Sequence, residues 1–291
     1  MSWWITRRRI DPLIEMRRYA AILAYDGTAY QGFQRQPEPT PTIQAAVEKA
    51  ISQVTAQPAS IVGAGRTDAG VHASGQVIAF DVGWKHGVDE LLRAINSQLP
   101  ADISLRGLWR KEGFHPRFDA LWRQYAYRIA TPATRHPLLT RHVWQLIGVS
   151  LDLERMNAAA ATCLGEHDFA AFGRPPQQGS SNTVRRIYWS RWETESGAFG
   201  RRLRYRIRGT AFLYHMVRRL VGVMAQVGQG EISPGEFEDI LRSRDIARAK
   251  HLAPANGLIL EAIGYPQSQE TESTTRAEAL DMMAAAPKGQ T

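Results

Sequence analysis

The sequence is poor in cysteine, in lysine and in long apolar runs. Its single cysteine, Cys163, excludes an internal disulfide and a cysteine-based metal site, and suits a reducing compartment. No run approaches the roughly 18 consecutive apolar residues that a membrane-spanning helix needs. The basic residues at the N-terminus are not followed by an apolar segment, so we expect no signal peptide. These shortages together favour a cytoplasmic protein that does not contact a membrane.

Lysine is scarce although the chain is strongly basic. Its 36 basic residues comprise 31 arginines and 5 lysines, the net charge is +8, and the pI is near 9.9. A basic surface implies an acidic partner. Arginine offers a planar fork to phosphates and a flat surface for stacking on bases, which favours nucleic acid as that partner. GC-rich coding would produce the same bias towards arginine.

The apolar patterning predicts alternating strands and helices in two similar halves. Period-2 and continuous apolar segments predict strands over 19–25, 76–82, 103–110, 125–129, 184–192, 201–208 and 258–265. Helical periodicity predicts helices over 43–54, 88–97, 153–164, 215–227 and 236–248. The order predicts an α+β fold of two ferredoxin-like halves. We place the N-terminal half at 17–118, the C-terminal half at 119–266 and a disordered tail at 267–291.

The strand over 201–208 indicates a charged surface. Its apolar residues alternate with arginines, so period 2 places the apolar set on the core and the guanidinium groups on the opposite face. Like charges spaced two residues apart repel one another, which is tolerable mainly where phosphates or carboxylates visit. We therefore predict that these residues bind substrate: Arg202, Arg204, Arg206 and Arg208.

A glycine-rich segment over 65–73, GRTDAGVHA, holds several reactive side chains. Arg66 and Asp68 are two residues apart, so on an extended stretch they point to the same side and can pair. A carboxylate is ionised at neutral pH, and one held by an arginine is an available nucleophile. A structural ion pair or turn would use the same residues. Asp68 and His72 could also be two metal ligands, although no third ligand is evident nearby.

The same segment resembles the signature of the tRNA pseudouridine synthase A family. Further blocks resemble that family in the family's order, namely YDGT at 25–28, FHPRFDA at 114–120, HMVR at 215–218 and PANGL at 254–258. The resemblance runs from about 19 to 266. It implies the pseudouridine synthase fold, a continuous, mostly antiparallel sheet with helices on one face and the active-site cleft on the other.

The family pattern assigns roles position by position. Asp68 falls on the essential aspartate and Arg66 on its arginine partner, while Arg218 falls on a second active-site arginine. Tyr125 falls on the tyrosine that stacks on the target base. An apolar residue under the base corresponds to one of two positions, Leu258 or Leu260. Tyr214 departs from the pattern, since some members have arginine there.

The resemblance also implies the reaction. The family isomerises uridine to pseudouridine in the anticodon stem-loop of tRNA, at positions 38, 39 and 40, and works as a homodimer. The isomerisation oxidises nothing and transfers no group to another molecule, so we expect no cofactor and no metal. The aspartate either forms an adduct or promotes departure of uracil through a glycal.

Two other classes of function compete with this interpretation. A non-catalytic RNA-binding module would have no need for Asp68. A glycosidase-like hydrolase would call for a second carboxylate, which Asp119 could supply. The histidines of these motifs receive no catalytic role in any of the three interpretations.

Overall fold

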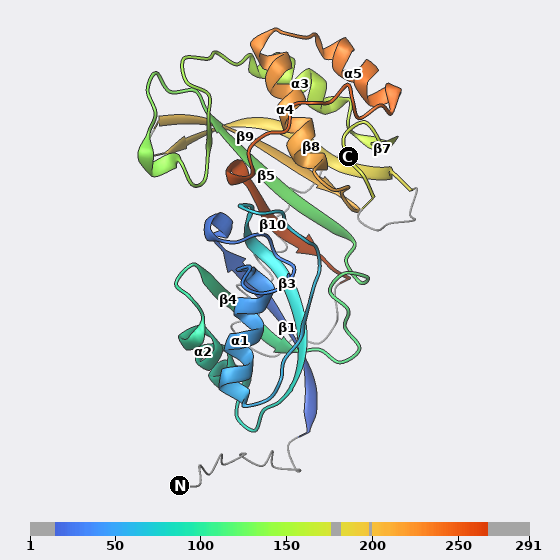
Figure 1. The fold of residues 1–291 in the computed structure, drawn as a ribbon. Helices are drawn as coiled ribbons and strands as arrows, with labels where there is room; N and C mark the ends of the chain where they lie inside the picture. The colour runs from blue at the N-terminus through green and yellow to red at the C-terminus, as the bar shows by residue number, and fades with distance from the viewer. Residues whose placement is uncertain (1–14, 176–181, 198–199, 267–291) are drawn as a thin grey trace.

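The computed structural model describes residues 15–175, 182–197 and 200–266. Figure 1 shows an elongated molecule in which strands of both halves continue one another. The strands form a single ten-stranded sheet with the main order β4-β1-β3-β10-β5-β9-β8-β7. The α+β fold with a mostly antiparallel sheet is confirmed, because only β10–β3 and β5–β6 pair in parallel. The expected tail over 267–291 lies outside the described residues.

The N-terminal half follows a β-α-β-β-α-β order with spatial order β4-β1-β3-β2, which is the ferredoxin-like arrangement. Its elements are β1 (Met16–Tyr25), α1 (Ile43–Thr55), β2 (Ile61–Gly63), β3 (His72–Gly83), α2 (Val88–Gln98) and β4 (Ile103–Arg110). Helix α1 begins where predicted, because the Thr42 hydroxyl accepts a hydrogen bond from the backbone of Ala45 and caps the first turn.

The C-terminal half repeats that arrangement as β10-β5-β9-β8. Its elements are β5 (Trp122–Ala130), β6 (Trp144–Gln145), α3 (Leu153–Ala161), β7 (Gly165–Asp168), β8 (Val184–Gly197), β9 (Gly200–Gly209), α4 (Met216–Gln229), α5 (Pro234–Ser243) and β10 (Leu258–Gly264). The short strands β2, β6 and β7 were not predicted, since strands of two to four residues carry too little periodicity.

The two halves join through a short parallel pairing. Ile259 and Leu260 of β10 lie opposite His72 and Ala73 at the start of β3. Strand β3 is long enough to pair also with β1 and with β2. The connection from β2 to β3, which contains Asp68, therefore lies where the halves meet. None of the helices in the described part of the chain is long and apolar enough to cross a membrane.

Candidate active site

The loop that carries Asp68 is held by buried polar side chains from the N-terminal half. The Tyr25 hydroxyl lies 2.7 Å from the hydroxyl of Thr67, the residue before Asp68. The fully buried Gln76 donates its amide to the carbonyl of Gly65 at 2.7 Å. Unpaired buried polar groups are costly, so these bonds fix the loop to β1 and β3. Asp68 is thus placed by a rigid support.

The partners of the Asp68 carboxylate come from the other half of the chain. Arg218, in the first turn of α4, places Nη1 3.1 Å from Asp68 Oδ2. Its Nε donates to the carbonyl of Ala253 at 2.8 Å, which fixes the guanidinium plane. His215, just before α4, places Nε2 3.3 Å from the same oxygen. The Asp68 carboxylate therefore contacts two residues at the start of α4, Arg218 and His215.

Arg66 does not make the ion pair with Asp68 that the loop spacing suggested. Its side chain is exposed, and within the described ranges it forms no ion pair with a carboxylate. The expectation followed from two residues being close along an extended stretch. The contact is made instead by Arg218, which lies 150 residues further along the chain. The spacing of residues within one loop cannot indicate a contact with a residue so far along the chain.

His215 occupies an unusual backbone conformation. Its φ of 64° is left-handed, a region that residues other than glycine seldom adopt. The ring stacks on Tyr214 with centroids 3.7 Å apart. Burial lowers the pKa of His215, the positive charges of Arg218 and Arg219 lower it further, and Asp68 opposes them. The imidazole is therefore neutral at pH 7. Sequence reasoning gave this residue no role, although it opens the HMVR motif.

Tyr125 ends beside the Asp68 loop. A side-chain carbon placed on Gly65 would lie 3.9 Å from the Tyr125 hydroxyl. The ring is 9% exposed and meets Phe212 edge to face at 5.1 Å. Burial raises the pKa of Tyr125 to about 12, with Arg123 opposing the rise and Asp68 adding to it. The hydroxyl therefore carries its proton at neutral pH.

The two candidate leucines both lie beside β5 on the Tyr125 side of the sheet. Leu260 lies directly opposite Tyr125, whereas Leu258 lies opposite Tyr127. Side chains of directly opposed residues are neighbours. Leu260 is therefore the nearer neighbour of the Tyr125 ring, but it is fully buried, whereas Leu258 keeps slight exposure.

The candidate residues lie on the side of the sheet that carries α4. Tyr125 pairs with Ile207, and two residues along the same face Tyr205 stacks on Trp192 at 5.0 Å. The Trp192 indole in turn contacts the Met224 sulfur of α4 at 3.3 Å. Asp68 likewise takes its partners, Arg218 and His215, from the start of α4.

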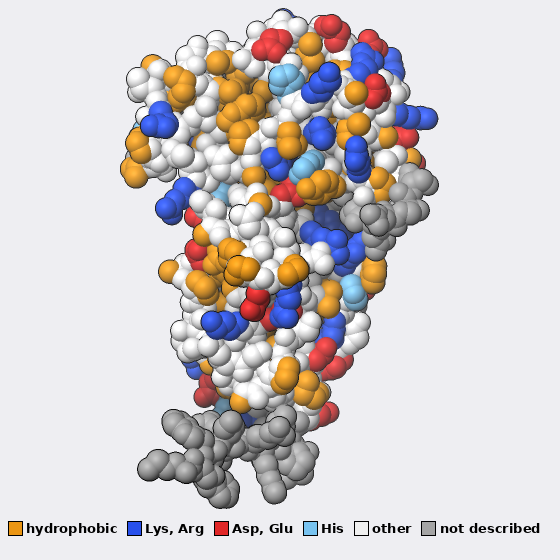
Figure 2. Space-filling view, in the orientation of Figure 1, with side chains coloured by type: hydrophobic (Ala, Val, Ile, Leu, Met, Phe, Trp, Pro, Cys, Tyr) orange, Lys and Arg blue, Asp and Glu red, His pale blue; other side chains and the backbone are white. Residues whose placement is uncertain are grey.

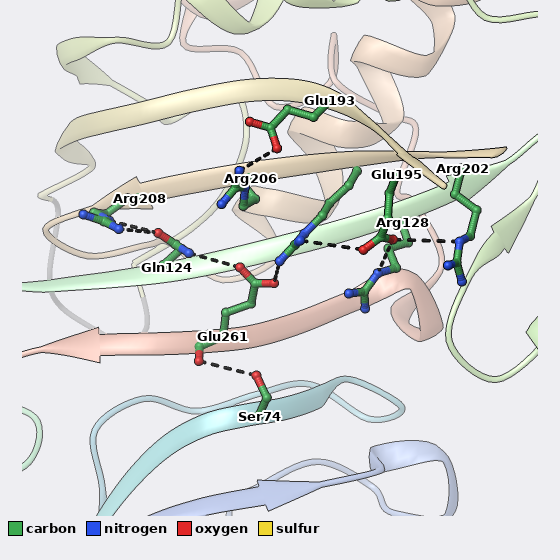
Figure 3. Close-up of polar contacts among 10 residues, drawn as sticks. Ser74, Gln124, Arg128, Glu193, Glu195, Arg202, Arg206, Arg208 and Glu261 are labelled. Carbon is green, nitrogen blue, oxygen red and sulfur yellow. Dashed lines mark hydrogen bonds and ion pairs between the residues drawn. The ribbon is translucent and has the colours of Figure 1, made fainter. Parts of the chain in front are cut away.

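The arginines of β9 lie on the opposite face, as period 2 predicted, but they have partners within the chain. Figure 3 shows a ladder of polar contacts across β8, β9, β5 and β10. Arg206 contacts Glu193 at 2.5 Å, Arg204 pairs with Glu261, and Arg202 lies 3.8 Å from Glu195. Arg208 donates to the Gln124 side chain.

These contacts remove the reason for expecting a phosphate ligand at the β9 arginines. The repulsion between neighbouring arginines is offset by carboxylates from the adjacent strands β8 and β10, and Glu195 also bonds to Arg128 at 3.0 Å. No phosphate is needed to make this row of like charges tolerable.

A second cluster of polar side chains lies between Asp26, the residue after β1, and His72, the first residue of β3. His72 Nδ1 lies 3.1 Å from Asp26 Oδ1, and His142 Nε2 lies 3.7 Å from Asp26 Oδ2. Their ligand atoms lie within 4.8 Å of one another, a spacing compatible with a metal ion. His72 Nδ1 also accepts the backbone N–H of Gly27 at 3.1 Å. His72 is therefore engaged with Asp26 rather than with Asp68, contrary to the metal pair considered from sequence.

Known proteins match most of the chain. Residues 21–119 and 159–266 match a family model described as tRNA pseudouridine synthase. A tRNA pseudouridine synthase A of Chloroflexus aurantiacus is 40% identical over 254 residues, which cover 86% of this chain and 90% of that protein. One from Neisseria meningitidis serogroup C is 36% identical, with 87% and 94% covered. One from Roseiflexus castenholzii is 39% identical, with 89% and 95% covered.

Proposed function

From the premise that this chain belongs to the tRNA pseudouridine synthase family, we propose that it isomerises uridine to pseudouridine in the anticodon stem-loop of tRNA. The target positions we propose are 38, 39 and 40, with Asp68 as the catalytic carboxylate. One observation supports this assignment above the others. Asp68 meets Arg218 and His215 of the C-terminal half beside Tyr125, at the junction of the two halves.

The reaction moves a glycosidic bond within one nucleotide. The bond from ribose C1′ to uracil N1 breaks, and a bond from C1′ to uracil C5 forms. C5 then loses its proton and N1 gains one, so the atoms and electrons of the nucleotide balance. The protein must supply a carboxylate for the departure of uracil, a surface for the detached base and a group that moves the C5 proton.

Asp68 is suited to the first task. Arg218 fixes its direction through a hydrogen bond of 3.1 Å and supplies a compensating positive charge. The carboxylate therefore stays aimed whether it attacks C1′ to give an adduct or promotes departure of uracil to give a glycal. Water must be kept away from the reacting atoms, because hydrolysis would release the base.

Tyr125 is suited to the other two tasks. Its ring lies beside the fully buried Leu260 of the neighbouring strand, and a flipped uracil can stack against that ring. Because the hydroxyl keeps its proton at neutral pH, it can take the C5 proton only while passing on its own. We therefore assign Tyr125 as stacking platform and proton relay.

Arg66 is exposed and carries an uncompensated charge within the described ranges. We assign it to the RNA rather than to Asp68. From the family we further propose that the protein acts as a homodimer in the cytoplasm, where its tRNA substrate is found. Light scattering on the purified protein measures its oligomeric state directly.

The test is conversion of unmodified tRNA by purified protein, with chemical mapping of pseudouridine and assay of free uracil. We expect pseudouridine in the anticodon arm and no uracil. Asp68→Asn keeps the shape but removes the charge, so it should abolish conversion while tRNA binding stays within a few-fold. Free uracil in place of pseudouridine would indicate a hydrolase, and binding without conversion would indicate an RNA-binding module.

A matched control is Asp119→Asn. Asp119 is the second carboxylate that a hydrolase would need, but its Oδ2 accepts the backbone N–H of His115 at 2.9 Å and so helps to close the turn after β4. We expect Asp119→Asn to keep isomerisation. Turnover by Asp68→Asn at more than a small fraction of the wild-type rate would sink the assignment of Asp68.

A further inference from the structure

An exposed aromatic ring lies directly outside the catalytic residues. Tyr214 is 55% exposed, although a ring of this size normally packs against the protein. One face of it stacks on His215, at 3.7 Å and 26° between planes, and His215 in turn lies 3.3 Å from Asp68. The two rings thus form a short column from the surface towards the catalytic carboxylate.

The backbone fixes the position of this ring. The Tyr214 N–H donates to the carbonyl of Arg174 at 2.9 Å, and the two residues form an isolated bridge. On its other side Tyr214 is joined to His215, whose left-handed φ of 64° is held by the start of α4. A non-glycine residue in this conformation carries strain, which persists where the surroundings enforce it. The ring is therefore placed in advance of any ligand.

The charges around the ring are mostly positive. The exposed Arg174 is the bridge partner of Tyr214, and Arg218 and Arg219 come from the first turn of α4. Burial lowers the pKa of Arg219, and the positive charges of Arg174 and Arg218 lower it further. In the described ranges no carboxylate pairs with Arg174 or Arg219.

This arrangement contrasts with the ladder on the other face, where each arginine has a carboxylate or amide partner. Figure 2 shows basic side chains gathered over the middle of the molecule, where the halves meet. The Arg219 guanidinium donates to the carbonyl of Ala249 at 3.0 Å, which leaves its charge without a carboxylate partner among the described residues. Cations of this kind beside an exposed aromatic ring are the combination that binds unstacked nucleotides, the cations through phosphates and the ring through base stacking.

We propose that Tyr214 stacks on the nucleobase next to the target uridine, with Arg174 and Arg219 binding the phosphates beside it. This inference rests on the proposed function. The target uracil itself belongs beside Tyr125 and Asp68, and His215 separates that position from Tyr214. A base on the free face of Tyr214 is therefore a neighbour of the target, and its stacking holds the strand open while the uridine is flipped.

The experiment measures the dissociation constant of an anticodon stem-loop RNA, intact or with an abasic nucleotide on the 5′ or the 3′ side of the target. For wild type we expect loss of the base on one side to weaken binding roughly tenfold. Tyr214→Ala should bind the intact RNA about as weakly as wild type binds the abasic RNA. Removal of that base should then weaken binding by Tyr214→Ala no more than about twofold. Tyr214→Phe keeps the ring and should behave as wild type.

Tyr188→Ala is the matched control, because Tyr188 is a comparably exposed tyrosine, at 50%, that lies on β8 rather than in the column of Tyr214 and His215. It should keep the full wild-type sensitivity to the abasic nucleotide. Equal sensitivity of wild type and Tyr214→Ala, or insensitivity of wild type on both sides, would overturn the proposal. The second outcome needs no variant and so stands even if Tyr214→Ala fails to fold.

Conversion of intact unmodified tRNA by wild type is measured in parallel. Failure to form pseudouridine would count against the proposed function itself. If pseudouridine forms but wild type and Tyr214→Ala are equally sensitive to the abasic nucleotide, only the stacking role of Tyr214 is overturned.

Discussion

The Arg218 guanidinium lies 3.1 Å from Asp68 Oδ2, although the two residues are 150 positions apart. Asp68 belongs to the loop before β3 in the N-terminal half, and Arg218 belongs to α4 in the C-terminal half. The carboxylate that we propose as catalytic is therefore held by Arg218 across the junction of the two halves, which pair through β3 and β10. We expect activity to depend on that junction.

The first prediction compares the two arginines near Asp68. Arg218→Gln removes the charge that orients the carboxylate and should lower the single-turnover rate by roughly 10²–10³-fold at saturating enzyme. Arg66→Gln should instead raise the dissociation constant of tRNA and leave the saturated rate within about tenfold. Single-turnover assays over a range of enzyme concentrations separate these effects. A saturated rate that falls as far for Arg66→Gln as for Arg218→Gln would favour the local ion pair expected from sequence.

Much of the fold follows from local patterns. The apolar periodicity places α1, α2 and β4 within a residue or two of their observed bounds, because their buried faces are continuous along the chain. The glycine-rich motif makes Asp68 a candidate for the catalytic carboxylate. Its orienting contacts depend on how distant segments meet, and that information is absent from the spacing of residues within one loop.

The same limit explains two further features that sequence reasoning missed. The carboxylates that neutralise the β9 arginines come from β8 and β10, and their positions depend on strand register. His215 reaches Asp68 through a left-handed backbone conformation that no local propensity indicates. Both are properties of the assembled tertiary structure.

Tyr125→Phe should separate the two roles proposed for that residue, stacking platform and proton relay. Phenylalanine keeps the ring face, so tRNA affinity should hardly change. It lacks the hydroxyl, so the step that removes the C5 proton should slow by about 10²–10⁴-fold. Release of tritium from tRNA labelled at C5 measures this step. Equal rates for Tyr125→Phe and wild type would leave Tyr125 as a platform only.

The polar contacts between the β9 arginines and the neighbouring strands give a prediction about stability rather than about tRNA binding. Arg206→Gln leaves Glu193 without its partner at 2.5 Å, and both side chains are partly buried. We expect Tm to fall by about 2–4 °C, while the dependence of tRNA binding on salt is unchanged. A salt slope shallower by roughly one unit would instead assign Arg206 to a phosphate.

The last prediction concerns the pH dependence of stability and follows from His72. Burial lowers the pKa of His72 below its ordinary value of 6.5, with Asp26 opposing the shift and His142 adding to it. In the unfolded chain His72 regains its ordinary value. Below about pH 6.5 the unfolded state therefore binds a proton that the folded state does not, so stability falls as pH falls through this window.

His72→Asn tests this directly, because the asparagine oxygen can replace Nδ1 as acceptor of the Gly27 N–H but does not titrate. Urea unfolding at pH 7.5, 6 and 5 should show a smaller loss of stability for His72→Asn than for wild type. Some loss should remain, since burial also lowers the pKa of His215. His251→Asn, which alters an exposed histidine, is the control and should follow wild type. If His72→Asn loses as much stability as wild type between pH 7.5 and 5, His72 does not set the pH dependence.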